Sequence, residues 1–320
     1  MMAAGLPYSG DTDLSDTSER RTGALPLPYR KMNGLGNAFA VLDARDAAVR
    51  AGLARLDEAA IARLARPEVI GFDQFILLEP PRDSAADVFM RIRNADGGEV
   101  EACGNATRCV GWLVAGETGR DSVAIETVAG LLRARSVGDH RVSVDMGRPR
   151  LGWQEIPLSE EFHDTSAIEL EIGPRGAPVL HSPAVVNVGN PHAIFFVDRD
   201  VESFGLERWG PMIEHHPLFP ERVNVSLAQR LSPREMRLKV WERGVGLTEA
   251  CGTAACAAAV AGARRGLTER AVAVHLPGGV LDIEWRADDD RIMMTGGLED
   301  EGPGEITDAM LAGDAARGTA

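Results

Sequence analysis

The chain has 320 residues, 44% of them hydrophobic and 26% charged, which suits one large or two ordinary globular domains and argues against disorder. Its formal net charge of −14 argues against a broad surface for nucleic acid or an anionic membrane, and favours a small-molecule partner. No apolar run approaches the roughly 18 to 20 residues that a membrane-spanning helix needs.

The N-terminal segment, residues 1–25, is rich in serine, threonine and acidic residues and lacks the apolar stretch of a secretory signal. We interpret it as a flexible extension of a cytoplasmic protein. The four cysteines are too few for a disulfide framework, and a reducing compartment keeps them as thiols. Cys103 and Cys109, like Cys251 and Cys256, are spaced too widely for the C-x-x-C-like pairs of structural zinc sites. We therefore expect no metal site.

Short apolar runs along the chain predict a strand-rich fold. The runs are residues 39–43, 75–79, 88–92, 193–197 and 236–240. Turn residues at Gly138-Asp139 and at residues 288–290 predict hairpins between later strands. Helices are fewer, so the expected fold class is α+β.

An internal repeat divides the chain into two halves. EACGNATRC begins at Glu101 and EACGTAAC begins at Glu249, which places Cys103 and Cys251 148 positions apart (251 − 103). The segments VAIETVAG and VAVHLPGG, and then VSVDMG and IMMTGG, repeat at nearly the same offset. Upstream, GNAFAVLD has a counterpart in GNPHAIFFVD. Because these matches keep one order, we predict two homologous lobes.

Each lobe is predicted to be a mostly antiparallel sheet wrapped around a central helix, with the active site between the lobes. Residues 26–148 are expected to form the first lobe and residues 149–296 the second. Residues 297–310 are expected to return to the first lobe, and residues 311–320 to form a flexible tail.

In each lobe the repeated cysteine opens a run of small residues, 103–115 and 251–263, that suits a helix. The free N–H groups and the positive dipole end of a helix start favour a thiolate and can also hold a carboxylate. Two such starts facing each other would place a base and an acid on opposite faces of one α-carbon, so its proton could be exchanged without a cofactor. Cys109 and Cys256 lie deeper in the same helices and are expected to be core.

Several motifs together resemble the diaminopimelate epimerase family, which interconverts LL- and meso-diaminopimelate for lysine and peptidoglycan precursors. They are KMNGLGNAF (31–39), GFDQ (71–74), NADGGEVEACGNATRC (94–109), NVGNPH (187–192), RVNV (222–225) and ERGVGLTEACGTAAC (242–256). The resemblance implies a cytoplasmic isomerase that uses neither pyridoxal phosphate nor another cofactor. It also implies an amino-acid substrate and a homodimer.

The resemblance further implies roles for individual residues. Cys103 and Cys251 would be the two acid/bases, assisted by His192 and Glu242, with the imidazole titrating near neutral pH and helping to set the thiol charge. The reacting α-carboxylate would bind at Gly104, Asn105, Gly252 and Thr253. The non-reacting end of the substrate would be recognised by Asn37, Gln74, Asn94, Asn190, Asn224, Glu242 and Arg243, whose amide and charged groups suit ammonium and carboxylate partners.

The chain departs from the family pattern at four positions: Asn33, Ala38, Leu247 and Ala254, where the family often has His, Asp, Glu and Gly. Of these, Ala254 adds a Cβ near the expected carboxylate site. The main alternative is another two-cysteine enzyme such as a proline or hydroxyproline racemase, which does not need the distal residues, whereas phenazine-type isomerases lack the cysteine pair. A non-catalytic amino-acid-binding protein and a thiol redox protein are alternatives from other classes.

Overall fold

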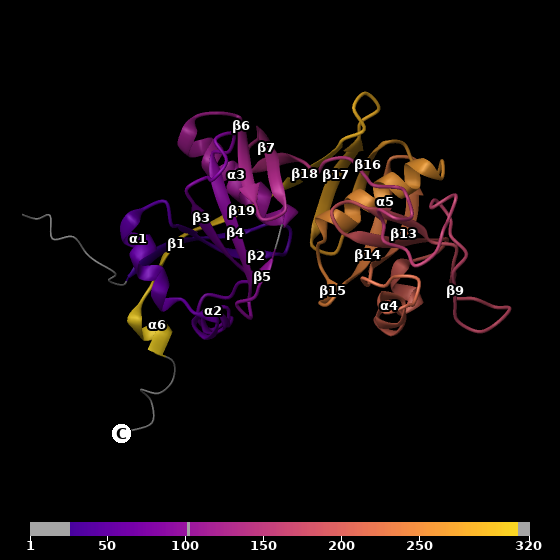
Figure 1. The fold of residues 1–320 in the computed structure, drawn as a ribbon, viewed down its shortest axis with the longest axis horizontal. Helices are drawn as coiled ribbons and strands as arrows, with labels where there is room; N and C mark the ends of the chain where they lie inside the picture. Colours follow the sequence, from indigo (N-terminus) through magenta and orange to yellow (C-terminus); the bar gives the residue numbers. More distant parts are fainter. Residues whose placement is uncertain (1–25, 101–102, 313–320) are drawn as a thin grey trace, which may run out of the picture.

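The computed structural model describes residues 26–100 and 103–312, and it forms two lobes side by side (Figure 1). The extension expected at residues 1–25 lies outside the described residues, as do residues 313–320 of the expected tail. Residues 311 and 312 of that tail belong instead to a short helix, α6 (Asp308–Ala312).

The sheet of the first lobe combines antiparallel pairs with two parallel ones. Strand β2 runs parallel to β3, and β4 runs parallel to β6, while the other pairs in this lobe are antiparallel. The strands are β1 (Leu27–Asn33), β2 (Ala38–Asp43), β3 (Gln74–Glu79), β4 (Val88–Asn94), β5 (Glu99–Val100), β6 (Ser122–Thr127), β7 (Gly130–Gly138) and β8 (Arg141–Asp145).

The second lobe repeats this pattern. Strand β12 runs parallel to β13 and β14 runs parallel to β16, with antiparallel pairs elsewhere. The strands are β11 (Ala184–Asn187), β12 (Pro191–Val197), β13 (Asn224–Ser232), β14 (Glu235–Glu242), β15 (Gly246–Thr248), β16 (Ala271–Leu276), β17 (Gly279–Trp285) and β18 (Ile292–Gly297). A separate small hairpin is formed by β9 (Glu171–Ile172) and β10 (Leu180–His181).

Two strand pairings join the halves of the chain. Strand β8 pairs antiparallel with β18, so the sheets of the two lobes are continuous at this point. The chain then crosses from β18 into β19 (Glu299–Ile306), which pairs antiparallel with β1 (Figure 1). Residues 299–306 therefore belong to the sheet of the first lobe, while the lobe boundary expected at residue 148 stays a prediction.

One long helix packs inside each lobe: α3 (Gly104–Thr118) in the first and α5 (Gly252–Arg264) in the second (Figure 1). Almost every residue of α5 is buried, which fits its run of alanines, because a helix that is apolar all round is stable only inside a core. A single apolar cluster includes residues of both helices and both sheets, and Cys109 and Cys256 lie in it with no exposed surface. The predictions of an α+β fold and of these two core cysteines are confirmed.

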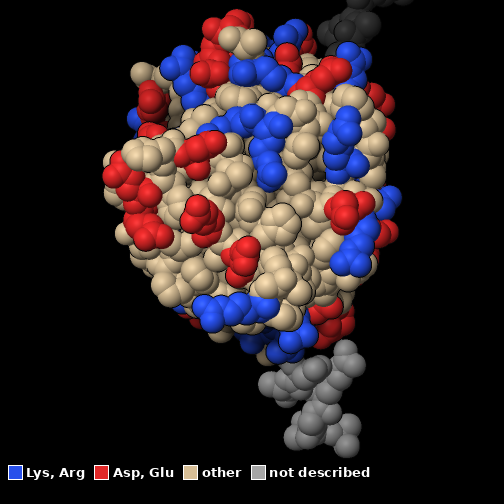
Figure 2. Space-filling view, turned by 90° about the vertical axis from the view of Figure 1, so that its right-hand side faces the viewer, with Lys and Arg blue, Asp and Glu red and all other residues tan. Residues whose placement is uncertain are grey.

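The remaining helices cover the outer faces of the sheets. They are α1 (Ala47–Gly52), η1 (Leu53–Arg55) and α2 (Glu58–Leu64) in the first lobe, and η2 (Val201–Phe204) and α4 (Leu206–Glu214) in the second. On the face shown in Figure 2, acidic and basic side chains are interspersed among uncharged ones. Among the described residues, no helix has both the length and the apolarity that crossing a bilayer requires.

Candidate active site

The two repeated cysteines stand at the starts of the two central helices. Cys103 is the N-cap residue of α3 and Cys251 is the N-cap residue of α5, each in an extended backbone conformation. The sequence prediction that each helix begins at its cysteine is confirmed. The backbone N–H groups of Asn105 and Ala106 face the Cys103 sulfur, and that of Ala254 faces the Cys251 sulfur; each favours the thiolate.

The starts of the two helices converge on one side chain, Met294 of β18. A Cβ added to Gly104 would lie 2.9 Å from Met294 Cε, and one added to Gly252 would lie 2.8 Å from Met294 Sδ. Across the same gap, the Asn105 side-chain amide donates to the carbonyl of Ala250, the residue before the second cysteine, at 3.5 Å. These contacts with one side chain bring both cysteine loops to one place in the structure.

A loop of the first lobe also reaches the second lobe beside the site. A Cβ on Gly36, which has a positive φ of 84°, would lie 2.8 Å from a carboxylate oxygen of Glu249. The backbone of the same loop touches Gly278, whose added Cβ would meet the Leu35 carbonyl oxygen at 2.1 Å. This loop carries Asn37, whose side-chain oxygen lies 3.8 Å from the Cys103 sulfur.

The two thiols have different polar neighbours. Cys251 interacts with the Glu242 carboxylate, which raises the pKa of the thiol, and its sulfur lies 3.5 Å from the Thr253 hydroxyl. Glu242 in turn accepts a 2.6 Å hydrogen bond from the Thr248 hydroxyl. Cys103 has the Asn37 amide oxygen as its side-chain partner. The second lobe therefore supplies a carboxylate to its thiol, and the first lobe supplies a neutral amide.

Burial changes the expected ionisation of both cysteines. Burial raises the pKa of Cys103 and raises that of Cys251 well above the ordinary value, and the charge of Glu242 pushes both in the same direction. The helix N–H groups lower the two pKa values, as expected, but by less than burial raises them. The expected net decrease of the thiol pKa is therefore wrong, because the net change is an increase. Burial also raises the pKa of Glu242.

His192 is not a group that titrates near neutral pH, contrary to expectation. It has no exposed surface, and burial together with the positive charge of Arg243 lowers the pKa of the imidazole to about 3. One ring nitrogen, Nε2, lies 2.7 Å from the Asn190 side-chain oxygen, so it carries the proton. The other, Nδ1, is buried without a partner among the described residues. The ring is thus a neutral acceptor.

The residues expected to recognise the distal end of the substrate form two groups. In the first lobe, Gln74 donates to Asn94 at 3.1 Å across β3 and β4, and the Gln74 side-chain oxygen is buried without a partner. In the second lobe, Asn224 donates to the Pro191 carbonyl and accepts from the backbone N–H of Arg243, both at 3.0 Å. These contacts fix each group internally. Among the described residues no hydrogen bond joins one group to the other.

The Arg243 guanidinium donates to the carbonyl of Glu221 at 2.8 Å, so part of it is held by the protein's own backbone. Of the departures from the family pattern, Ala254 has no exposed surface and Leu247 is 46% exposed. No set of three or more potential metal-ligating side chains occurs in the described part of the chain.

Sequence reasoning missed Arg108, which lies on α3 behind the Cys103 loop. It has no exposed surface, and its guanidinium donates to the Asn105 side-chain oxygen at 3.1 Å. The signal available in the sequence was its position three residues after Asn105, since residues i and i+3 share a helix face.

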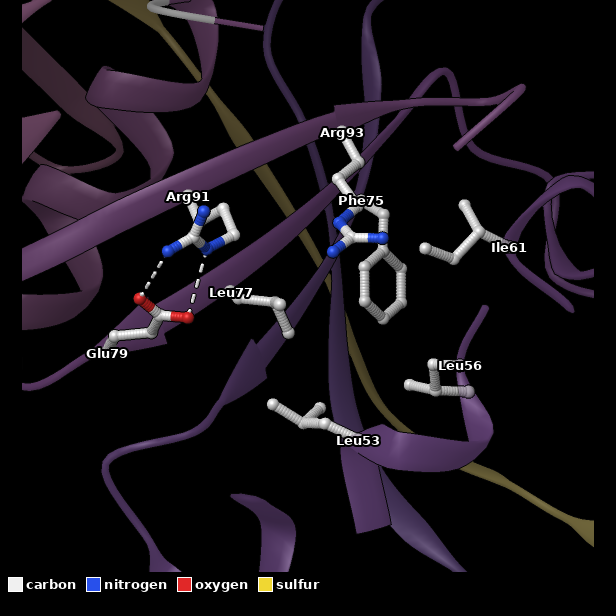
Figure 3. Close-up of a pocket in the computed structure, with 8 residues that line it drawn as sticks. All are labelled: Leu53, Leu56, Ile61, Phe75, Leu77, Glu79, Arg91 and Arg93. Atoms are coloured by element: carbon white, nitrogen blue, oxygen red, sulfur yellow. Dashed lines mark hydrogen bonds and ion pairs between the residues drawn. The ribbon is translucent and has the colours of Figure 1, made fainter. Parts of the chain in front are cut away.

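A separate hollow lies on the outer face of the first lobe, between β3, β4 and the α1–α2 segment (Figure 3). Its polar side includes the bidentate Arg91–Glu79 ion pair, with distances of 3.0 and 3.2 Å. The other lining residues are Leu53, Leu56, Ile61, Phe75, Leu77 and Arg93. None of the residues expected in the site lines it.

Comparison with known proteins agrees with the repeat and the cysteine motifs. The sequence profile of the family described as diaminopimelate epimerase matches residues 29–152 and 184–299. A diaminopimelate epimerase of Rhizobium meliloti (strain 1021) is 53% identical over 280 residues, covering 88% of this chain and 91% of that protein. One from Brucella anthropi is 54% identical over 286 residues, covering 89% and 93%.

Among solved structures, a hydroxyproline epimerase from Agrobacterium vitis with bound trans-4-hydroxy-L-proline is similar in fold. Its TM-score is 0.59 at 17% sequence identity, covering 88% of this chain and 92% of that one.

Proposed function

This chain belongs to the diaminopimelate epimerase family and is an isomerase; from that premise we propose that it interconverts LL- and meso-diaminopimelate with Cys103 and Cys251 as paired acid and base. The observation that carries the proposal is the meeting of two helix starts, each capped by one of these cysteines, at Met294. We further infer a role in lysine and peptidoglycan precursor synthesis in the cytoplasm, and a homodimer.

In the proposed reaction, the substrate α-carbon lies between the two sulfurs. One thiolate removes the α-proton from one face, and the opposite thiol delivers a proton to the other face, so the configuration inverts. In the reverse direction the two cysteines exchange roles. The N–H groups at both helix starts, with Asn105 and Thr253, would hold the α-carboxylate, where negative charge grows as the carbanion forms.

The raised pKa of both thiols means that a base must be generated when the substrate binds. Glu242 is suited to this step at Cys251, because the two side chains interact and burial raises the carboxyl pKa, which makes the carboxylate a stronger base. Substrate binding would also bring an ammonium group near the sulfurs, and a neighbouring positive charge favours the thiolate. His192, neutral and with Nδ1 free of partners, would accept a hydrogen bond from the substrate.

Recognition of the distal end would fall to Asn37, Gln74, Asn94, Asn190, Asn224, Glu242 and Arg243, which distinguishes the proposal from a racemase of ring amino acids. A proline-like substrate has no second amino-acid centre for these polar groups to bind. The unpartnered Gln74 oxygen and the part of the Arg243 guanidinium not held by Glu221 are free to accept an ammonium and to bind a carboxylate.

The test is incubation of purified protein with LL-diaminopimelate in D₂O without pyridoxal phosphate. Deuterium should enter at one α-carbon as the meso isomer appears. Cys103→Ala and Cys251→Ala should each stop interconversion, whereas Cys109→Ala and Cys256→Ala, in the core beyond each start, should keep it. Binding without deuterium exchange would contradict the proposal and indicate a binding protein, and racemisation of proline in place of diaminopimelate would contradict the assigned substrate.

A further inference from the structure

Arg108 is a buried cation without a counter-ion among the described residues. It is the largest of their side chains that has no exposed surface. Its Nη1 donates to the Asn105 side-chain oxygen at 3.1 Å and its Nε to the Gly297 carbonyl at 3.4 Å, while Nη2 has no partner. An arginine in a protein remains protonated, and a buried charge is costly unless another group balances it. The balancing anion must therefore arise at this place or arrive with a ligand.

The groups whose charges act on the guanidinium are three thiols. Burial lowers the pKa of Arg108, and the thiols of Cys109, Cys103 and Cys256 oppose this effect. Burial raises the pKa of Cys109 and Cys256 to about 12, so neither is an anion near neutral pH. Burial also raises the pKa of Cys103, the thiol at the helix start, and the charge of Glu242 raises it further. The positive charge of Arg108 acts in the opposite direction and favours the Cys103 thiolate, whereas Cys251 feels no such effect of Arg108.

Arg108 also fixes the geometry of the gap between the lobes. It holds the oxygen of the Asn105 amide, and the nitrogen of the same amide reaches the Ala250 carbonyl at 3.5 Å, next to the second cysteine. Its bond to Gly297 ties the helix to β18, the strand that carries Met294. A Cβ on Gly296 would lie 3.1 Å from Arg108 Nε, so the guanidinium fits closely against this strand.

We propose that Arg108 is a positioning residue of the active site: it holds Asn105 in the gap between the two helix starts and supplies a fixed positive charge on the Cys103 side of that gap. The carboxylate of Glu242, in contrast, acts on both thiols and disfavours the thiolate of each. Without substrate, the charge of Arg108 therefore acts on Cys103 and not on Cys251, so that removing it should affect the two thiols unequally. The effect on substrate binding rests on the proposed function, whereas the effect on the thiol does not.

The first test needs no substrate. Cys103 and Cys251 are alkylated with iodoacetamide between pH 6 and pH 10, and each site is followed by mass spectrometry of its own peptide. In Arg108→Met and Arg108→Gln, loss of the nearby charge should move the Cys103 profile to higher pH by about one unit, which slows its alkylation roughly tenfold below the midpoint. The Cys251 profile should move less. Arg135→Met, which removes an exposed charge from β7, is the matched control and should leave both profiles unchanged.

The second test separates charge from position. Arg108→Lys keeps the charge but cannot hold Asn105 and Gly297 together, so its Cys103 profile should stay near that of the native protein while KM for diaminopimelate rises. If Arg108→Met and Arg108→Gln do not fold, the KM of Arg108→Lys still tests the proposal. An unchanged Cys103 profile in folded Arg108→Met or Arg108→Gln would contradict the proposed effect of the Arg108 charge on Cys103. An unchanged KM in Arg108→Lys would contradict the proposed positioning of Asn105. Failure of the proposed substrate would leave the alkylation result standing.

Discussion

The carboxylate of Glu214 should stabilise the turn that carries Glu242 and Arg243. It lies at the end of α4 with 4% of its side chain exposed. One oxygen accepts from the Trp241 indole N–H at 2.8 Å, and the other accepts from the Gly244 backbone N–H at 2.9 Å. These two donors flank the Glu242–Arg243 pair on both sides, so the two hydrogen bonds together fix the path of the chain through it.

The expected cost of Glu214→Ala follows from these contacts. A hydrogen bond to a charged group contributes about 1.5 to 3 kcal/mol, and a buried donor left without a partner adds to the loss. Gly244 is exposed, so water can replace its lost partner, whereas the indole N–H is partly buried. We therefore assign the full cost only to the hydrogen bond with the Trp241 indole, and we expect the free energy of unfolding to fall by about 2 to 3 kcal/mol. Glu214→Gln keeps one acceptor and should lose about half as much.

Urea denaturation measures the stability change, and steady-state kinetics measure its effect on the site. KM for diaminopimelate should rise more than kcat falls, because the displaced turn carries Glu242 and Arg243, which we propose bind the distal end of the substrate. Glu207→Ala is the matched control, since that residue lies on the same helix with 62% of its side chain exposed and should change stability by less than about 0.5 kcal/mol. A native-like KM and midpoint in Glu214→Ala would refute the reasoning.

Three further predictions concern the thiols and the buried imidazole. Because the two helix starts meet, mild oxidation should join Cys103 to Cys251 and abolish activity, and dithiothreitol should restore it; activity that survives oxidation would argue against opposed thiols. Because the pKa of both thiols is raised, kcat/KM should increase with pH above neutrality, and a profile that is flat from pH 7 to 9 would contradict this. Because the pKa of His192 is lowered to about 3, the folded protein disfavours the charged ring that the unfolded chain accepts, so its contribution to stability is complete above about pH 6.5 and is lost as pH falls toward 3. His192→Gln should therefore flatten the dependence of urea stability on pH in that range.

The repeat explains how far sequence could predict this structure. An offset that persists through strands, glycines and cysteines predicted two similar lobes, and the parallel pairs β2–β3 and β12–β13 follow the same plan. The helix starts were predictable because a cysteine preceded a run of small residues at both places. The short pairing of β8 with β18 was not predictable, since it depends on two edges meeting only after both lobes have folded.

The ionisation of the site was predicted less well than its geometry, and burial is the reason. The sequence correctly predicted that the helix N–H groups lower the pKa of the two thiols. Burial raises the pKa by more, and it is caused by residues distant in sequence that exclude water. The same holds for His192, which has no exposed surface and lies in β12 between β11 and β13. Arg108 was missed because its polarity suggested a surface position, whereas the fold places it between α3 and β18.

The two lobes are alike at the cysteines that proton transfer requires, and they differ at the residues expected to bind the distal end of the substrate. Inverting one carbon needs two similar acid/bases on opposite faces, and both lobes supply a cysteine at a helix start. Reading a substrate with one reacting and one non-reacting end needs different groups. Gln74 faces Asn94 across β3 and β4. In the second lobe β13 pairs Val225 with Trp241, and continuing this register by one residue brings Asn224 opposite Glu242, so an amide in one lobe corresponds to a carboxylate in the other.

The two lobes also differ in a buried positive charge. Arg108 of the first lobe corresponds in the repeat to Cys256 of the second lobe, so here the first lobe has an arginine and the second a thiol. The negative charge of Glu242 thus acts on both thiols, whereas the positive charge of Arg108 acts on Cys103 and not on Cys251. A duplicated fold with a symmetric pair of thiols would not favour either sulfur as the base in the free enzyme. These two differences within the repeat make the charged surroundings of the two thiols unequal. Because Arg108 and Glu242 act on Cys103 in opposite directions, removing both charges in Arg108→Met combined with Glu242→Gln should leave the Cys103 alkylation profile closer to that of the native protein than Arg108→Met alone does.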